Sequence, residues 1–142
     1  MWHVEDSVET TAAPETVWRT WTEVHGWPRW VTDFEWSRLT GAFAAGSTIE
    51  NKAKGLPVAT VRIAAADPPS YFRTESRFLG MHLVFDHWVD ATPTTTRIRT
   101  RMNFGGPLAP LLRLVRGRAI ADSTRVSLRR LAALAEMEAG AA

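Results

Sequence analysis

The stretch Val24-His25-Gly26-Trp27-Pro28-Arg29-Trp30 decides how the rest of this chain is interpreted. It follows a helical pattern over residues 14–23, whose apolar side chains recur at helical spacing after a proline suited to a first turn. Gly26 interrupts this pattern, and Pro28 opens a second short helix that ends near Val31. We therefore predict two short helices in succession, which close one end of a sheet.

Alternation of apolar and polar residues predicts strands on both sides of these helices. Trp2, Val4 and Val8 alternate with polar residues, which is typical of a strand with one buried face, here over residues 2–10. After the helices, turns rich in glycine and proline separate six further strands. These are predicted over residues 34–40, 47–54, 57–66, 71–79, 81–90 and 95–104. Their short connections indicate an antiparallel meander.

One long helix is predicted at the C-terminal end, from Pro107 to about Glu138, where Leu, Ala and Arg dominate. At 1.5 Å per residue it would be roughly 45 Å long. The predicted class is α+β, with a seven-stranded antiparallel sheet wrapped around this helix and the two short helices between strands one and two. We expect a single domain over residues 1–142. A chain of this size buries about 68–70% of its unfolded surface, enough for a core and a cavity.

Composition and motifs exclude several classes of protein. The 142 residues include no cysteine, so disulfides, thiolate zinc sites and cysteine nucleophiles are excluded. The four histidines lie in distant elements or on opposite strand faces, so no metal is expected, and no nucleotide motif suggests a cofactor. A net charge of +2 is no nucleic-acid signature. No apolar run approaches the ~18 residues of a membrane span, and we expect a soluble, unexported cytoplasmic protein.

Three parts of the chain resemble the START-like SRPBCC superfamily, and within it the polyketide cyclase/dehydrase and lipid transport branch. They are the segment from Ala13 to Leu39, the triplet Phe85-Asp86-His87, and the segment from Gly106 to Leu112. The resemblance covers nearly the whole chain and implies a helix-grip fold of the START/Bet v 1 type, with a cavity between the sheet and the long helix. Members of that superfamily include cyclases, dehydratases and lipid carriers, so the resemblance implies a hydrophobic ligand more specifically than a reaction.

Strand alternation predicts which side chains line this cavity. The inward-facing candidates for ligand binding are Phe72, Thr74, Ser76, Phe85, Thr100 and Met102. Trp30 and Trp36 are predicted to flank the cavity mouth. Asp122, Ser123 and Val126 are predicted to lie above the cavity on the long helix, where Asp122 and Ser123 would offer a hydrogen bond to the ligand. Mostly apolar walls with a few polar groups are what a small-molecule site requires.

His87 is the candidate catalytic residue, because it falls on the apolar face between Phe85 and Val89. Its unperturbed pKa of about 6.5 suits proton transfer near neutral pH. The alternative is a core histidine with a satisfied hydrogen bond, or one that only orients a polar group of the ligand.

Two further charged residues are ambiguous in direction. Strict alternation would aim Asp6 inward, where a carboxylate must be paired or protonated. A bulge or twist near residues 5–7 would instead send it to solvent, and we favour this second alternative. Arg38 is in phase with Phe34 and Trp36, so it could face inward and hold a carboxylate or enolate. We favour the alternative, in which Arg38 faces solvent.

The outward face of the sheet carries an arginine-rich set that includes Arg73, Arg97, Arg99 and Arg101. The leading interpretation is a solvated cross-strand charge ladder. The alternative is a docking face for an acidic partner such as an acyl carrier protein.

The sequence thus predicts a domain that binds a hydrophobic or aromatic small molecule, as a polyketide cyclase or dehydratase does. Such an enzyme would use His87 as base, with Thr74, Ser76 or Thr100 placing oxygens. The alternative is a noncatalytic carrier or sequestering protein for a lipid or similar hydrophobe. Either protein could act as a monomer or a homodimer.

Overall fold

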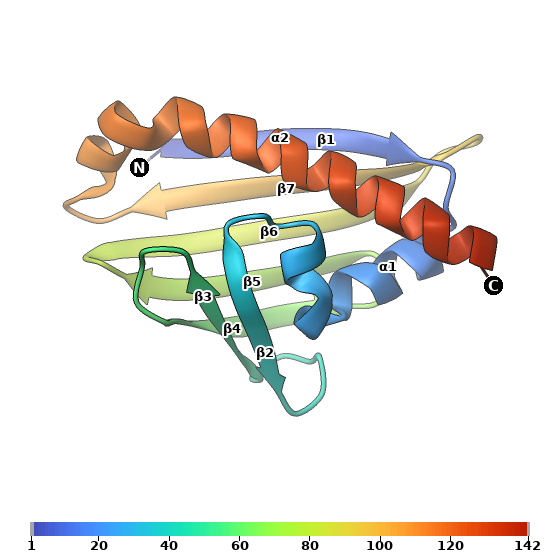
Figure 1. The fold of residues 1–142 in the computed structure, drawn as a ribbon, viewed down its shortest axis with the longest axis horizontal. Helices are drawn as coiled ribbons and strands as arrows, with labels where there is room; N and C mark the ends of the chain where they lie inside the picture. The colour runs from blue at the N-terminus through green and yellow to red at the C-terminus, as the bar shows by residue number, and fades with distance from the viewer. Residues whose placement is uncertain (1, 142) are drawn as a thin grey trace.

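Seven strands form one antiparallel sheet in the computed structural model of the chain, which describes residues 2–141 (Figure 1). The strands are β1 (Trp2–Thr10), β2 (Phe34–Thr40), β3 (Thr48–Ala53), β4 (Ala59–Asp67), β5 (Tyr71–Phe78), β6 (Met81–Ala91) and β7 (Thr96–Gly105). Their spatial order is β1-β7-β6-β5-β4-β3-β2, so six consecutive strands form a meander and β1 pairs with the last of them. The predicted seven-stranded sheet is confirmed.

Two short helices and one long helix complete the fold: α1 (Pro14–Thr22), the 3₁₀ helix η1 (Val24–Arg29) and α2 (Ala109–Ala141). The prediction for the second short helix was wrong in position, because η1 begins at Val24 rather than at Pro28. Gly26 belongs to η1 and is buried, and a Cβ there would lie 2.5 Å from the guanidinium of Arg29. Gly26 is therefore part of the helix and does not interrupt it.

The core fills one end of the space between the sheet and the helices. Val17 and Trp21 of α1, Phe72 of β5 and Leu131 of α2 are almost fully buried in one cluster. Figure 1 shows α1 beside the last turns of α2 at this end. The packed end leaves the other half of the interior, under the first half of α2, for a cavity.

A second, smaller cluster fixes the beginning of α2 to the opposite edge of the sheet. The Trp2 ring stacks on Phe104 with 4.3 Å between centroids, and both side chains are buried together with Ala109. The indole Nε1 of Trp2 donates a hydrogen bond of 2.8 Å to the carbonyl oxygen of Ala109. This contact ties α2 to β1 and β7 where the helix starts.

Candidate ligand-binding cavity

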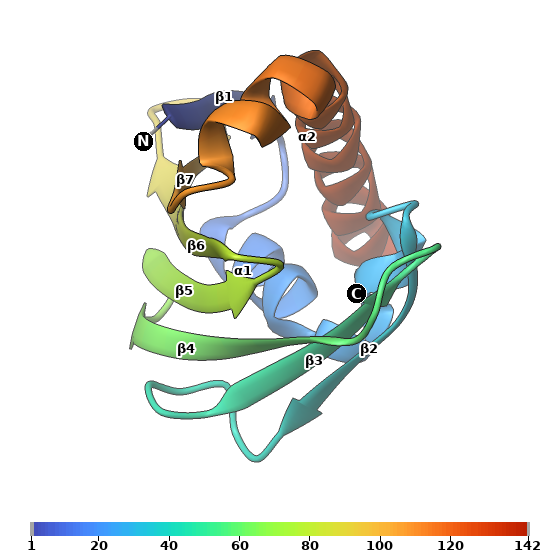
Figure 2. The same ribbon diagram turned by 90° about the vertical axis from the view of Figure 1, so that its left-hand side faces the viewer.

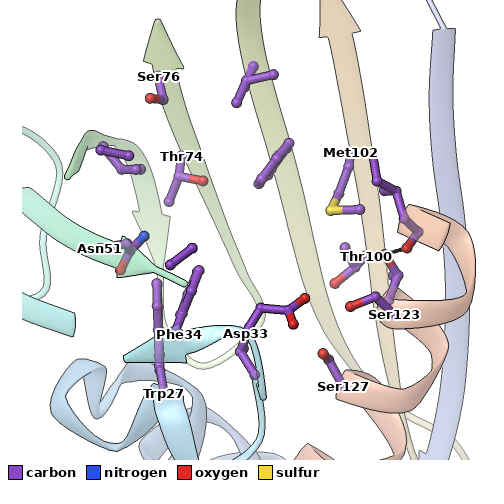
Figure 3. Close-up of a pocket in the computed structure, with 18 of the residues that line it drawn as sticks. Trp27, Asp33, Phe34, Asn51, Thr74, Ser76, Thr100, Met102, Ser123 and Ser127 are labelled. Carbon is purple, nitrogen blue, oxygen red and sulfur yellow. Dashed lines mark hydrogen bonds between the residues drawn. The ribbon is translucent and has the colours of Figure 1, made fainter. Parts of the chain in front are cut away.

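A cavity of about 380 Å³ lies between the sheet and α2. Its sheet wall is formed by alternate side chains of three neighbouring strands, as a period of two requires. These are Thr74, Ser76 and Phe78 of β5, Leu83, Phe85 and His87 of β6, and Thr100 and Met102 of β7. Figure 3 shows the labelled members of this wall directed inward. Most of the predicted inward-facing set therefore lines one continuous cavity.

His87 lies at the deep end of the cavity among aromatic rings. Its ring centroid is 4.4 Å from that of Phe72 and 5.0 Å from that of Trp21. The Nδ1 atom is 2.9 Å from the hydroxyl oxygen of Thr100, the residue directly opposite it on β7. Among the residues that the structure describes, Nε2 has no hydrogen-bond partner.

Burial lowers the pKa of His87 to about 3, against a smaller opposing influence of the neighbouring Asp86 carboxylate. Taking an imidazolium out of water is costly, and the surrounding rings offer it no counter-charge on the cavity side. The imidazole is therefore neutral near pH 7. With Nδ1 engaged by Thr100, the neutral ring offers a single nitrogen, Nε2, to a bound molecule.

The floor of the cavity is aromatic and includes two buried polar atoms. Trp27, Trp30 and Phe34 line it, and Trp27 packs against both of the others. Within the described part of the chain, Nε1 of Trp30 and Oδ1 of Asn51 are buried without a hydrogen-bond partner. Because an unsatisfied buried polar atom costs about 1–3 kcal/mol, these two atoms favour a polar group entering from the cavity.

The helix side of the cavity is polar. Ser123 and Ser127 are four residues apart on one face of α2 and line the cavity with Arg116 and Ile120. Figure 3 shows their hydroxyl groups and the carboxylate of Asp33 directed toward the same part of the cavity. Asp33 lies in the connection between η1 and β2 and is itself exposed to solvent.

Sequence reasoning missed Asp33 and Ser127, and it named Ser123 together with Asp122 without deciding which of the two faces the cavity. Asp33 gives no periodic signal because it lies outside any regular element. For α2, the predicted phase was wrong by about one residue, which turns a helix face by roughly 100°. Asp122 and Val126 are exposed and lie outside the cavity, whereas the adjacent Ser123 and Ser127 line it.

Two aromatic candidates also lie elsewhere than predicted. Trp36 is 39% exposed and does not line the cavity. A register shift between Phe34 and Trp36 reverses the alternation in β2, so that Ser37 faces inward and Trp36 and Arg38 face solvent. Phe72 is buried in the core behind the His87 ring and supports the cavity wall without lining it. Trp30 lines the cavity, but it is buried in the cavity floor and does not flank the mouth as predicted.

The two ambiguous charged residues have partners outside the cavity. The register of β1 against β7 is continuous, so the predicted bulge near Asp6 was wrong. Asp6 accepts a hydrogen bond of 3.3 Å from Nε of Arg125 on α2. The solvent-facing interpretation of Arg38 is confirmed, since its guanidinium lies over the Trp36 ring and pairs with Glu50.

The outer face of the sheet carries cross-strand ion pairs. Arg97 and Arg99 lie within 3.8 and 3.6 Å of carboxylate oxygens of Glu9 and Glu5 on β1. The guanidinium of Arg99 also lies 4.1 Å from the centroid of the Trp88 ring. The leading interpretation as a charge ladder is confirmed. These arginines are engaged within the sheet, which gives no support to an acyl carrier protein docking there.

One carboxylate on this outer face is buried. Asp86 accepts hydrogen bonds from Nε of Arg73, at 2.7 Å, and from the hydroxyl of Tyr71. Burial alone would raise the pKa of Asp86, but the hydrogen bonds from Arg73 and Tyr71 outweigh it and lower that pKa. Burial, with the hydrogen bond to Asp86, raises the pKa of Tyr71. The cluster ties β5 to β6 on the side opposite the cavity.

An antiparallel sheet that grips a long helix around a cavity defines the helix-grip class. The chain belongs to the polyketide cyclase / dehydrase and lipid transport family, whose sequence profile matches residues 1–136. This confirms the resemblance to the SRPBCC superfamily. No curated protein matches the sequence.

Solved structures with low sequence identity share the fold. The chain is similar to the di-domain ARO/CYC StfQ from the steffimycin biosynthetic pathway, with a TM-score of 0.80 and 13% identity over 97% of this chain and 51% of StfQ. It is similar to Ara h 8.0201, with a TM-score of 0.71 and 13% identity over 94% of this chain and 97% of that one. It is also similar to the Aha1 dimer from Colwellia psychrerythraea, with a TM-score of 0.72 and 15% identity over 96% of this chain and 97% of that one.

Two negative findings apply to the residues that the structure describes. None of their helices is long and apolar enough to cross a membrane. No group of three or more His, Asp or Glu side chains among them is arranged to hold a metal ion.

Proposed function

We propose that the protein binds a neutral, hydrophobic molecule with a ring system in the cavity between the sheet and α2. The observation that carries the proposal is the apolar cavity with the uncharged His87 at its deep end. Aromatic and aliphatic walls favour an apolar ligand, and a small number of polar groups would fix its orientation. Trp30 Nε1 and the free nitrogen of His87 supply neutral donors for a carbonyl or hydroxyl oxygen of the ligand, and Oδ1 of Asn51 can accept from a ligand hydroxyl group.

A reaction of the cyclase or dehydratase type would use this binding site on a polyketone. A base removes a proton from a carbon next to a carbonyl group, and hydrogen bonds stabilise the enolate oxygen before ring closure or loss of water. A pKa of about 3 makes His87 a weak base near neutral pH, which supports a role as a neutral hydrogen-bonding group toward that oxygen. The carboxylate of Asp33, which points into the cavity, is then the candidate base.

A noncatalytic carrier of a lipid or similar hydrophobe is the second candidate function. A carrier needs the same cavity walls. The hydrogen bond between His87 and Thr100 favours this function, because a histidine that only positions a ligand does not have to transfer a proton. Native mass spectrometry of the purified protein would identify what copurifies. A ring-bearing polyketide supports the enzyme, and a fatty acid or phospholipid supports the carrier.

Substitution of two residues separates these functions. If Asp33 is the base, Asp33→Asn should lower turnover of a polyketone analogue by roughly 10²–10⁴-fold while leaving its affinity nearly unchanged. His87→Ala should weaken binding of the same analogue by about 1–3 kcal/mol, the cost of losing a buried hydrogen-bond partner. Calorimetry beside a turnover assay measures both effects. If turnover survives Asp33→Asn but is abolished by His87→Ala, and the affinity of both variants for the analogue is unchanged, then His87 is the base and Asp33 is not.

A further inference from the structure

The exposed apolar side chains of this protein are concentrated at one end of the cavity. Seven of the ten large hydrophobic residues exposed within residues 2–141 lie on three segments there. They are Leu56 and Val58 between β3 and β4, Leu79 in the β5–β6 turn, and Leu108, Leu111, Leu114 and Val115 near the start of α2. Figure 2 views the molecule from this end, with the three segments arranged around it.

These segments border the opening of the cavity. Leu56 and Pro57 line the cavity as well as being exposed, and Arg116 of α2 does the same. The side chain of Leu108 lies beside Gly80, which connects the start of α2 with the β5–β6 turn. The exposed apolar surface and the cavity are therefore continuous. We call this surface, made by residues 54–58, 79–80 and 107–118, the mouth surface.

The mouth surface is positively charged throughout. It contains Lys54, Arg113, Arg116 and Arg118, all exposed, and no aspartate or glutamate. Within residues 2–141, none of these four cations has a carboxylate within ion-pair distance, whereas Arg73, Arg97 and Arg99 of the outer sheet face are paired. Acidic residues return on α2 only from Asp122 onward. Cations and apolar side chains thus alternate over one end of the molecule.

Leu79 is unfavourable in its position for two separate reasons. It has a φ of +51° and is followed by Gly80 at +75°, so the two residues form the mirror-image turn that joins paired strands. Asn, Asp or Gly is preferred there, because a side chain branched beyond Cβ is strained in the left-handed region. The leucine is also 51% exposed. Neither the turn nor the solvent favours leucine, which points to an apolar contact outside the chain.

We propose that the mouth surface docks on an anionic lipid bilayer. Apolar side chains that project from separate segments can enter the boundary between headgroups and acyl chains, while arginines and a lysine contact the anionic headgroups. A second copy of this chain fits less well, since it would bring Arg113 and Arg118 of one copy toward like charges. Docking would place the cavity opening against the acyl region, so that a hydrophobic ligand could enter or leave without crossing water.

Cosedimentation with vesicles tests the proposal with the whole protein. The wild-type protein should bind vesicles of phosphatidylcholine containing phosphatidylglycerol, bind pure phosphatidylcholine much less, and lose binding as salt rises. Leu114→Ser with Val115→Ser should weaken the partition by at least tenfold. Arg113→Gln with Arg118→Gln should weaken it by about fivefold for each arginine.

Two further variants separate docking from folding. Leu79→Asn fits the turn better, so it should weaken vesicle binding without lowering the unfolding temperature. Met137→Ser and the pair Arg129→Gln and Arg130→Gln lie on the later, exposed part of α2 and should leave binding unchanged. The proposal is overturned if the Leu114 and Val115 variants bind vesicles as the wild type does. It is equally overturned if those changes instead dissociate a homodimer, or if only a soluble acidic protein binds the mouth surface.

Discussion

At the scale of single residues, His87 shows what alternation along a strand can predict and what it cannot. Period two predicted that it faces inward, and its register against Thr100 confirms that direction. Its protonation state could not be predicted from the sequence, because the rings of Trp21 and Phe72 that desolvate it come from α1 and β5. Similarly, the register shift that turns Trp36 outward leaves no mark in a pattern of alternating residues.

The buried imidazole makes a testable contribution to stability. The pKa of His87 in the folded protein, about 3, lies below the value of about 6.5 expected when the chain is unfolded. The folded state therefore binds fewer protons, so the stabilisation is complete above pH 6.5 and is lost as the pH falls toward 3. Between pH 7 and pH 5 the free energy of unfolding should fall by about 2 kcal/mol. This pH interval lies above the lowered pKa of Asp86.

Denaturant unfolding of the wild type and His87→Phe at several pH values measures this contribution. Phenylalanine keeps the aromatic packing but cannot take up a proton, so the variant should lose about 2 kcal/mol less than the wild type over the same interval. Parallel curves for the two proteins would show that the imidazole titrates normally in the folded state.

At the scale of elements, strands were easier to predict than helix faces. Turns bound the strands, so the ends and the inward side of most of them followed from composition, as in β5 and β7, whereas the register shift hid the inward side of β2. For α2 the inward phase was hidden, because leucines occur on both sides of its first half. Leu112 and Ile120 pack inward, while Leu111 and Leu114 are exposed. An apolar pattern that serves two surfaces gives no single direction. For that reason Ser127 was missed, and Ser123 could not be distinguished from Asp122 as the residue that faces the cavity.

The beginning of α2 is held by Trp2, and its contribution can be separated into packing and hydrogen bonding. Trp2→Ala removes the stack on Phe104 and the bond to Ala109, and should lower the free energy of unfolding by about 3–5 kcal/mol. Trp2→Phe keeps much of the packing and should cost less, about 1–3 kcal/mol, chiefly from the lost indole hydrogen bond. Urea unfolding of the three proteins gives both differences. Equal stability of Trp2→Phe and Trp2→Ala would mean that the ring stack contributes nothing.

At the scale of the whole molecule, the fold follows from how the chain divides its apolar residues. Val17, Trp21, Phe72 and Leu131 fill one end completely, whereas at the other end the apolar faces of β5, β6 and β7 and the first half of α2 enclose the cavity. The sequence predicted the sheet, the helix and the existence of a cavity between them. It could not predict the position of the opening, which depends on three segments that are distant in sequence and meet only in the folded chain.

Titration with 2-naphthol, a neutral ring compound with one hydroxyl group, tests the central claim most directly. Calorimetry should detect binding of one molecule per chain to the wild type. Ser127→Trp places an indole in the cavity and should weaken that binding at least tenfold, while Asp122→Trp, five residues earlier on the exposed face of α2, should leave it unchanged. Equal affinity in all three proteins, or no binding by the wild type, would contradict the assignment of this cavity as the ligand site.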